Sequence, residues 1–434
     1  MKFPRRRLLA FVPFLPIAAA SAKSKKADGP LDVGQALASA LESGLGLLRL
    51  PAGEFSVTAL QINKPFLLEG VPGQTILAGD GQAPLLSISN TEDVTITGIT
   101  FKGKNGPATD ETKSTGLVAA NGVERLSIKN CTLMESALSG IHLEQCSGEV
   151  SSCHFSKLDQ FGLLAKDCNA LHVTDNVVDD MGNGGIAVWQ SNKGPDGARI
   201  TNNAVSRVRA DAGGSGQYGN GINVFNGANV TIANNATSDC AFSGIRCNST
   251  INALISGNTL LRSRETGLYV EFSFEGSIIT GNIVDGASAG ISIANFMQGG
   301  RLAVCTGNML RNLRRGDFKE APPGTGIACE AETIVSNNVI EGTDAAAIQL
   351  GWGEYCRNLV AQGNIIRNAA RGISFSDVKG AGHVLIAGNM IDGAKDFAIA
   401  GMQWDKVTTG DFLMAGLTPP AHVMMYGNVL TGPT

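Results

Sequence analysis

The sequence predicts an all-β solenoid, a parallel β-helix, and repeating features of two kinds lead to that fold class. A Gly-Ile or Gly-Leu phrase recurs ten times between Gly116 and Gly372, and Ala replaces Gly in two further copies at Ala347 and Ala398. Most steps between neighbouring copies are 21 to 26 residues long, and two are 36. A fixed period in this range is typical of a solenoid. The apolar runs are short and rich in β-branched side chains, so we expect each repeat to form one coil of short strands.

A series of Asn residues recurs with the same period as these phrases. Its members are Asn130, Asn176, Asn203, Asn235, Asn258, Asn282, Asn308, Asn338, Asn364, Asn389 and Asn428. Asn tolerates the left-handed backbone region and its amide can bond nearby backbone groups, so the series predicts a sharp turn in each coil. Because neighbouring strands lie about 4.8 Å apart, we expect the stacked amides to hydrogen-bond along the axis of the solenoid.

The first 22 residues have the features of an export signal. Lys2 and three consecutive arginines, residues 5–7, precede an apolar stretch over residues 8–20, and residues 20–22 form an Ala-Ser-Ala cleavage site. The stretch is too short to cross a membrane, and no later segment approaches a spanning length. Paired arginines predict export by the twin-arginine route, and an ordinary secretory signal is the alternative. We therefore expect a periplasmic or secreted protein.

We expect the exported chain to form one β-helix domain. Residues 23–29 are a linker, and residues 30–434 form the β-helix: 30–110 the N-terminal cap and first coils, 111–404 the regular coils, and 405–434 a C-terminal loop and last strand. Residues 31–41 have helical spacing of apolar side chains, and short apolar runs follow from residue 48. A short helix over the open end of the stack is the kind of terminal cap that repeat proteins require.

Composition limits the partners and cofactors. A net charge of −4 with no long basic run argues against binding of nucleic acid. Two pairs of the nine Cys, 131 with 153 and 146 with 168, fall on equivalent positions of adjacent coils. Packed free thiols are therefore favoured over disulfides, which stay the alternative in an exported protein. With five scattered His and no Cys-x-x-Cys, we expect no metal and no other cofactor. We expect a monomer.

The helix followed by Leu50-Pro51-Ala52-Gly53-Glu54-Phe55 resembles the opening of pectate-lyase-like β-helix proteins. With its twin arginines and its Gly-Ile and Gly-Asn repeats, the whole chain is similar to the Tat-translocated repetitive proteins. This resemblance implies a right-handed, single-stranded parallel β-helix with a short capping helix, but no assigned reaction. Relatives of the fold act on polysaccharides as lyases, hydrolases and epimerases, and the characteristic motifs of the characterised relatives are not present here. Fold alone does not transfer function.

In proteins of this fold the substrate groove usually follows the strand that the Gly-Ile phrase opens. Strand alternation turns the second and fourth residues after Gly outward. In four central coils these outward residues are Ala187, Trp189, Asn223, Phe225, Arg246, Asn248, Tyr269 and Glu271. Aromatic faces stack on sugar rings, while amides and charges bond hydroxyls and carboxylates. The alternative is a solvated strand face. We expect these outward side chains to carry little core packing.

The other two tryptophans, Trp352 and Trp404, follow their Ala anchors at nearly the same distance as Trp189 follows Gly185. All three are therefore expected near the end of the same strand, either on a functional face or covering coil edges.

The two 36-residue steps predict long loops before the Gly-Ile strands at Gly221 and Gly326. The first loop contains Tyr218, and the second contains Arg314 and Arg315. Four coil steps, about 19 Å, separate the strands that they precede. Insertions on one face of a repeat protein often mark its binding face, so we expect a groove between these loops.

Two classes of function stay open. The first is an enzyme acting on a uronate-containing glycan as a lyase or epimerase, with Arg246, Tyr269 and Glu271 as catalytic residues. A hydrolase would need two carboxylates, and Glu271 with Glu265 is the nearest pair. The second class is a non-catalytic polysaccharide-binding or envelope structural protein. In both, the partner is a polysaccharide or oligosaccharide, with Asn223, Phe225, Asn248, Tyr218 and Trp189 as binding residues.

Overall fold

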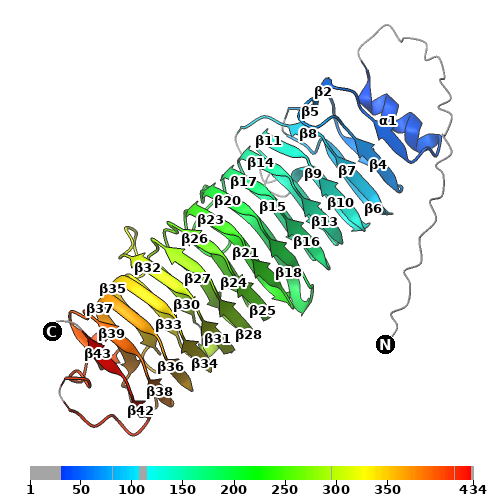
Figure 1. The fold of residues 1–434 in the computed structure, drawn as a ribbon. Helices are drawn as coiled ribbons and strands as arrows, with labels where there is room; N and C mark the ends of the chain where they lie inside the picture. Colours follow the sequence, from blue (N-terminus) through cyan, green and yellow to red (C-terminus); the bar gives the residue numbers. More distant parts are fainter. Residues whose placement is uncertain (1–30, 81, 107–114, 295, 415, 432–434) are drawn as a thin grey trace, which may run out of the picture.

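The computed structural model describes residues 31–80, 82–106, 115–294, 296–414 and 416–431. At residue 296 it describes the backbone and not the side chain. The predicted twin-arginine leader (residues 1–22), the linker (residues 23–29) and the predicted boundary at residues 110–111 lie outside the described residues. The described chain forms a long stack of coils, with the helix α1 at one end and the strand β43 at the other (Figure 1).

The helix α1 (Val33–Glu42) caps the first coils, as the sequence predicts. It begins after Asp32, whose carboxylate accepts a hydrogen bond from the backbone N–H of Gln35 at 3.0 Å, a standard N-cap contact. Val33, Leu37 and Ala40 are its buried residues, and they lie on one face of the helix. That face covers the end of the hydrophobic core.

Each coil contributes one strand to each of three parallel sheets. The first sheet contains β1 (Leu47–Arg49), β4 (Phe66–Glu69), β7 (Val94–Thr97), β10 (Leu126–Lys129), β13 (Gly148–Ser151), β16 (Leu171–Thr174), β19 (Arg199–Thr201), β22 (Thr231–Ala233), β25 (Ile251–Ser256), β28 (Glu275–Thr280), β31 (Arg301–Thr306), β34 (Thr333–Ser336), β36 (Leu359–Gln362), β38 (Val384–Ala387) and β42 (Val423–Tyr426).

The second sheet contains β2 (Gly53–Ser56), β5 (Thr75–Ala78), β8 (Thr100–Lys102), β11 (Thr132–Ser136), β14 (His154–Leu158), β17 (Val177–Met181), β20 (Ala204–Val208), β23 (Ala236–Cys240), β26 (Thr259–Leu261), β29 (Ile283–Asp285), β32 (Met309–Leu313), β35 (Val339–Leu350), β37 (Ile365–Ser376), β39 (Met390–Asp392) and β43 (Val429–Thr431). The strands β35 and β37 are long and continue into the third sheet.

The third sheet holds the Gly-Ile strands. It contains β3 (Leu60–Ile62), β6 (Leu86–Glu92), β9 (Gly116–Glu124), β12 (Ser139–Glu144), β15 (Phe161–Lys166), β18 (Gly184–Pro195), β21 (Asn220–Ala228), β24 (Ile245–Asn248), β27 (Thr266–Glu271), β30 (Ala289–Ile293), β33 (Thr325–Cys329) and β40 (Phe397–Gln403), besides the ends of β35 and β37. A short strand, β41 (Lys406–Val407), pairs antiparallel with β40.

The core is a continuous column of inward side chains. In the third sheet, Ile222, Ile245, Leu268, Ile291 and Ile327 stand in register on successive strands, and each is fully buried. The Gly before each of them is required by close approach: a Cβ at Gly244 would lie 2.8 Å from the carbonyl oxygen of Gly267 in the next coil. The repeating Gly-Ile phrase therefore records how closely the coils stack.

The predicted Asn ladder is present from Asn176 to Asn428. The side-chain amide of each Asn donates to the Oδ1 of the Asn one coil further on, for example Asn258 to Asn282 at 2.9 Å. The same Oδ1 also accepts the backbone N–H of the preceding Asn, at 3.0 Å from Asn258 to Asn282. Each amide further donates to a strand carbonyl, such as that of Ile232 for Asn258. These buried amides lie between the first and second sheets.

Two details of the Asn prediction need correction. The left-handed residue is the one that precedes the ladder, such as Gly257 at φ 65° or Asn234 at φ 57°. Asn130, at φ 53°, occupies this preceding position and does not belong to the ladder. Cys131 and Cys153 fill the ladder position in their coils, and the backbone N–H of Cys153 donates to the Oδ1 of Asn176.

All nine Cys are buried and free, which agrees with the favoured interpretation of packed thiols. Cys247 and Cys305 are fully buried, and burial raises the pKa of each thiol to about 12. They act as small apolar fillers of the core.

Candidate functional site

Four neighbouring strands of the third sheet, β18, β21, β24 and β27, carry the predicted site residues in two outward columns. The register places Asn223 beside Arg246, and Arg246 beside Tyr269. The second column is Trp189, Phe225, Asn248 and Glu271, each in register with the next. The alternation expected from the sequence therefore holds along these strands.

The first long loop, residues 209–219, bends over this surface. The side-chain amide of Asn223 donates to the carbonyl oxygen of Gly216 at 2.9 Å. The hydroxyl of Ser215 lies 2.9 Å from both carboxylate oxygens of Glu265, two coils further on, and it accepts a hydrogen bond from Nη1 of Arg246 at 2.7 Å. These contacts hold residues 215–217 over β21 and β24.

A cleft of about 460 Å³ lies between this loop and the strands. It is lined by Trp189, Ser215, Gly216, Gln217, Asn223, Phe225, Arg246, Asn248 and Phe272. Near the edge of the cleft that Phe272 forms, the end of β18 reaches the segment after β27. There Lys193 donates a hydrogen bond to the carbonyl oxygen of Ser273. A volume of this size suits one or two sugar rings or another small ligand.

Beneath the cleft, Arg246 and Glu271 form a two-pronged ion pair. Nε of Arg246 lies 2.6 Å from Oε1 of Glu271, and Nη2 lies 2.9 Å from Oε2. Nη1 lies 3.5 Å from a carboxylate oxygen of Glu265. The amide of Asn248 donates to Oε1 of Glu271 at 3.0 Å. Burial raises the pKa of Glu271 above its ordinary value, although the bonds from Arg246 oppose this shift.

Two tyrosines support the cleft without lining it. The guanidinium of Arg246 lies over the ring of Tyr269, 4.9 Å from its centre. Burial, assisted by the charge of Glu271, raises the pKa of Tyr269 to about 12. On the other side Tyr218 packs against Phe161, with ring centres 6.2 Å apart, and Phe161 packs edge-to-face against Trp189 at 5.5 Å. Phe161 thus contacts the rings of both Trp189 and Tyr218.

The expectation that these outward side chains carry little packing is wrong for Arg246 and Glu271. Their side chains are only 8% and 2% exposed. Both residues project outward from the coil, but the loop at residues 215–217 covers them. Glu271 and Glu265 also do not face each other across an open gap, because Arg246 contacts both carboxylates.

The position of the predicted groove also changes. The second long loop, residues 314–324, contacts the same corner as the first: Asp317 pairs with Arg264 at 2.8 Å, and Phe318 packs against Phe242 at 6.1 Å. Arg314 pairs with Asp344, and neither Arg314 nor Arg315 lines the cleft. The cleft therefore lies on the N-terminal side of the groove expected between the loops.

The three tryptophans do not share one place. Trp189 lines the cleft, whereas Trp352 and Trp404 lie in turns after β35 and β40 and pack edge-to-face at 5.6 Å. Sequence reasoning also missed three side chains of the cleft: Ser215, Gln217 and Phe272. Ser215 and Gln217 belong to the loop that the 36-residue step identifies. Phe272 lies beyond the strand at φ 57°, where alternation gives no signal.

Across the described residues, no group of three or more His, Cys, Asp or Glu is arranged to hold a metal ion. Nor does that part of the chain contain a helix long and apolar enough to span a membrane.

These features define a parallel β-helix protein with an aromatic and amide-lined cleft on its third sheet. The chain belongs to the family described as "Right handed beta helix region", whose model matches residues 74–205 and 191–299. It is a pectate-lyase-like right-handed β-helix. A search of curated proteins found no significant match.

Among solved structures, the chain is similar to PfbA, a surface adhesin of Streptococcus pneumoniae, at 15% identity over 86% of this chain and 88% of that one, with a TM-score of 0.44. A GH87 alpha-1,3-glucanase catalytic unit from Streptomyces thermodiastaticus matches at 14% identity over 93% and 66%, with a TM-score of 0.44. A PL6 alginate lyase in complex with a trisaccharide matches at 14% identity over 90% and 92%, with a TM-score of 0.47. These similarities concern the fold alone.

Proposed function

We propose that this chain is an exported carbohydrate-acting β-helix protein that binds a short stretch of a glycan in the cleft of the third sheet. The observation that carries the proposal is the lining of the cleft. Trp189, Phe225 and Phe272 offer aromatic faces, while Asn223 and Gln217 offer amides beside them. Aromatic faces stack on the C–H surface of a sugar ring, and amides carry both a donor and an acceptor for its hydroxyls.

The charges around the cleft favour binding over catalysis. All three nitrogens of the Arg246 guanidinium already contact acceptors of the protein. Nε and Nη2 bond to Glu271, and Nη1 contacts Ser215 and Glu265. A catalytic carboxylate would have to exchange its bond with Arg246 for one with the substrate. The geometry therefore supports the binding role that the sequence left as an alternative, with a neutral glycan as the ligand class that fits best.

A second candidate is β-elimination on a uronate-containing glycan, because Arg246 lines the cleft and its guanidinium lies over the ring of Tyr269. In this reaction a base removes the proton at C5, the C4–O4 bond breaks, a C4–C5 double bond forms, and the leaving oxygen takes up a proton. Arg246 would have to release Glu271 to neutralise the uronate carboxylate. With a pKa of about 12, the Tyr269 phenol is protonated at neutral pH, so it is suited to protonating the leaving oxygen.

A panel of neutral and uronate-containing oligosaccharides tests both candidates. Binding is followed by calorimetry, and turnover by the ultraviolet absorbance of unsaturated ends and by new reducing ends. We expect binding without turnover. Trp189→Ala and Phe225→Ala should each weaken binding about tenfold, equivalent to about 1.4 kcal/mol of lost stacking.

Trp352→Ala is the matched control, because Trp352 is an exposed tryptophan outside the cleft. Unsaturated product that disappears in Tyr269→Phe would instead support elimination. Equal binding by the wild type and both cleft variants would refute the assignment of the cleft.

A further inference from the structure

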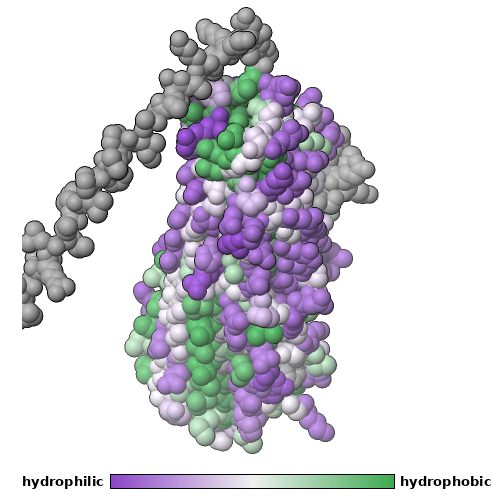
Figure 2. All heavy atoms as spheres, turned by 90° about the vertical axis from the view of Figure 1, so that its right-hand side faces the viewer, coloured by the Kyte–Doolittle hydropathy of each residue, from purple (hydrophilic) through white to green (hydrophobic). Residues whose placement is uncertain are grey.

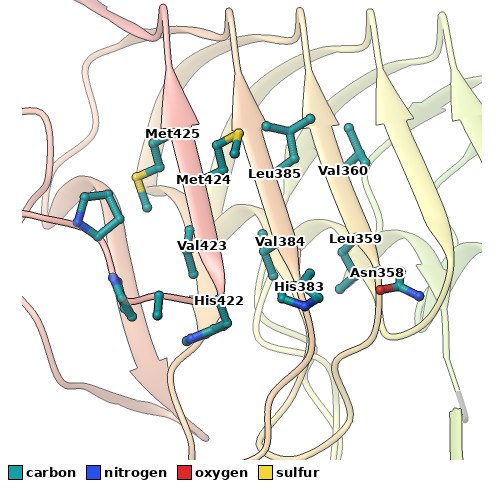
Figure 3. Close-up of a pocket in the computed structure, with 13 residues that line it drawn as sticks. Asn358, Leu359, Val360, His383, Val384, Leu385, His422, Val423, Met424 and Met425 are labelled. Atoms are coloured by element: carbon teal, nitrogen blue, oxygen red, sulfur yellow. The ribbon is translucent and has the colours of Figure 1, made fainter.

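The C-terminal half of the first sheet carries an outward aliphatic row, which is exposed at five of its seven positions and half-buried at Val360 and Leu385. It consists of one outward residue from each of seven successive strands: Leu254, Ile278, Val304, Ile334, Val360, Leu385 and Met424. Figure 2 shows a hydrophobic stripe along this face of the coils. In Figure 3, Val360, Leu385 and Met424 stand in a row on three neighbouring strands. Ile278, Ile334 and Met424 are 48%, 44% and 64% exposed.

From β7 to β22, after Leu47 and Leu67 on the first two strands, the same outward column is polar. There its residues, in register order, are Thr95, Ser127, Glu149, His172, Arg199 and Thr231. The change comes between Thr231 and Leu254, which are neighbours in register. A sheet whose outer face is simply solvated stays polar along its length, so the aliphatic row needs a covering partner.

Charge is scarce around the row. From β25 onward, the strands of the first sheet and the residues immediately before them carry two ion pairs, Arg301 with Glu275 and Arg357 with Glu332, both at the edge of the face. Among the residues that the structure describes, no cluster of Lys or Arg borders the row to hold an anionic membrane surface. Tyr426 is its one aromatic neighbour in these strands, so the row does not resemble the cleft of the third sheet. An added peptide strand could pair only with the free edge of β42, because the backbones from β25 to β38 are already paired on both sides, and a strand there would not cover the row.

We propose that this face binds a second copy of the chain, sheet against sheet, in a two-fold symmetric dimer. The pairings along the row have no register shift, so the face is regular, and two such sheets pack about 10 Å apart with interlocking side chains. Ile334 is the middle member of the seven. A two-fold axis at Ile334 pairs it with itself and pairs Leu254 with Met424 of the other copy.

The size of the face matches a weak dimer. Six coil steps at about 4.8 Å make the row about 29 Å long. With strands about 17 Å long, the face covers roughly 500 Å² per copy. The total of about 1,000 Å² is at the lower limit of specific interfaces. A further exposed row on the second sheet, which includes Met309, Ile365 and Met390, adjoins the Asn turns and adds contact area at one edge. This dimer departs from the monomer expected from the sequence.

Two hollows on the face receive side chains in this arrangement. One, of about 400 Å³, lies around Leu254, Ile278, Val304 and Ile334. The other, of about 800 Å³, lies between Val360, Leu385 and Met424 and the segment at residues 419–421, and it is the one drawn in Figure 3. The two-fold axis brings the first hollow of one copy against the second hollow of the other.

Sedimentation velocity on the full exported chain over a range of concentrations tests the proposal. The wild type should pass from monomer to dimer as concentration rises. Ile334→Arg places two guanidinium groups against each other at the axis and should weaken the dimer by about tenfold or more. Thr231→Arg is the matched control, since it lies in the same outward column one coil before the row, and it should dimerise like the wild type.

A second variant keeps the test decisive if Ile334→Arg unfolds. In Ile334→Cys, the two thiols at the axis should each give up a proton and an electron to added diamide and form a disulfide between copies, whereas the buried native Cys should not react. A wild type that stays monomeric throughout, a dimer unaffected by Ile334→Arg, or an uncrosslinked Ile334→Cys each overturns the proposal. Row-dependent binding of neutral or anionic lipid vesicles by a monomer overturns it as well, because the occupant is then a membrane.

Discussion

Arg246 and Glu271 form a two-pronged ion pair on adjacent coils, with N···O distances of 2.6 and 2.9 Å, and the pair is almost completely buried under the loop at residues 215–217. A buried ion pair is costly to break on one side only, because the remaining charge has no partner and little water. This relationship links the stability of the protein to the shape of the cleft above it.

Replacing Arg246 alone should therefore destabilise the protein strongly. We expect Arg246→Met to lower the free energy of unfolding by about 3–5 kcal/mol, because Glu271 and Glu265 lose their shared counter-charge. Chemical denaturation measures the change. Arg262→Met is the control: Arg262 pairs with Asp239 in the open, and its loss should leave stability nearly unchanged. The double variant Arg246→Met with Glu271→Gln should recover part of the loss, and a double variant less stable than the single one would contradict this account.

The Asn ladder gives a second stability prediction. Asn258→Ala removes two hydrogen bonds donated by the amide and leaves two donors of Asn235 without their acceptor. All of these groups are buried, so we expect a loss of about 1–3 kcal/mol or more in thermal or chemical unfolding. Asn192→Ala, at an exposed position, serves as the control. If both variants had the same melting temperature as the wild type, the ladder would not contribute to stability.

The raised pKa of Glu271 predicts a pH dependence. Because burial raises its pKa above the ordinary value of 4.5, the folded state holds this proton more tightly than the unfolded state. The contribution of Glu271 to stability is therefore largest at and below pH 4.5 and falls as pH rises through its folded pKa. The free energy of unfolding of the wild type, measured relative to that of Glu271→Gln at each pH, should decrease as the pH rises from about 4.5. If this relative free energy of unfolding increased over the same range, the bonds from Arg246 would have a larger effect on the pKa of Glu271 than burial has.

Export can be tested on the leader, which lies outside the described residues. Arg5→Lys combined with Arg6→Lys should leave precursor in the cytoplasm, since the twin-arginine route requires the pair. Fractionation followed by immunoblotting measures this. Normal export of the double variant would favour an ordinary secretory signal.

The fold could be predicted from the sequence because each coil repeats the same local constraints. The Gly-Ile phrase marks both a close backbone approach and a core residue, and its period follows from the length of one coil. Alternation along the same strands places Arg246, Asn248 and Phe225 on the outward face correctly. These inferences need only neighbouring residues and the knowledge that coils stack.

The rest of the site depends on contacts that no local pattern encodes. Ser215 reaches Glu265, fifty residues away, and this contact decides that Arg246 is covered. Trp352 and Trp404 follow their anchors at nearly the same distance as Trp189, but their extra residues lie in turns, so the similarity in spacing was misleading. Asn130 was misassigned for a similar reason, since Asn suits both the left-handed position and the ladder position beside it.

The Asn ladder also governs how this protein can change in size. Each Asn bonds to the Asn of the neighbouring coils, and the number of residues between them can vary: Asn203 and Asn235 are 32 residues apart, Asn258 and Asn282 are 24 apart, and both pairs are bonded. An insertion can therefore lengthen a loop without breaking the ladder, or it can add a whole coil that brings its own Asn. A duplicated coil would move everything beyond it by one strand spacing, about 4.8 Å, and would leave the cleft intact if it were inserted outside β18–β27. The length of the stacked core can therefore change in steps of one coil, independently of the chemistry of its cleft.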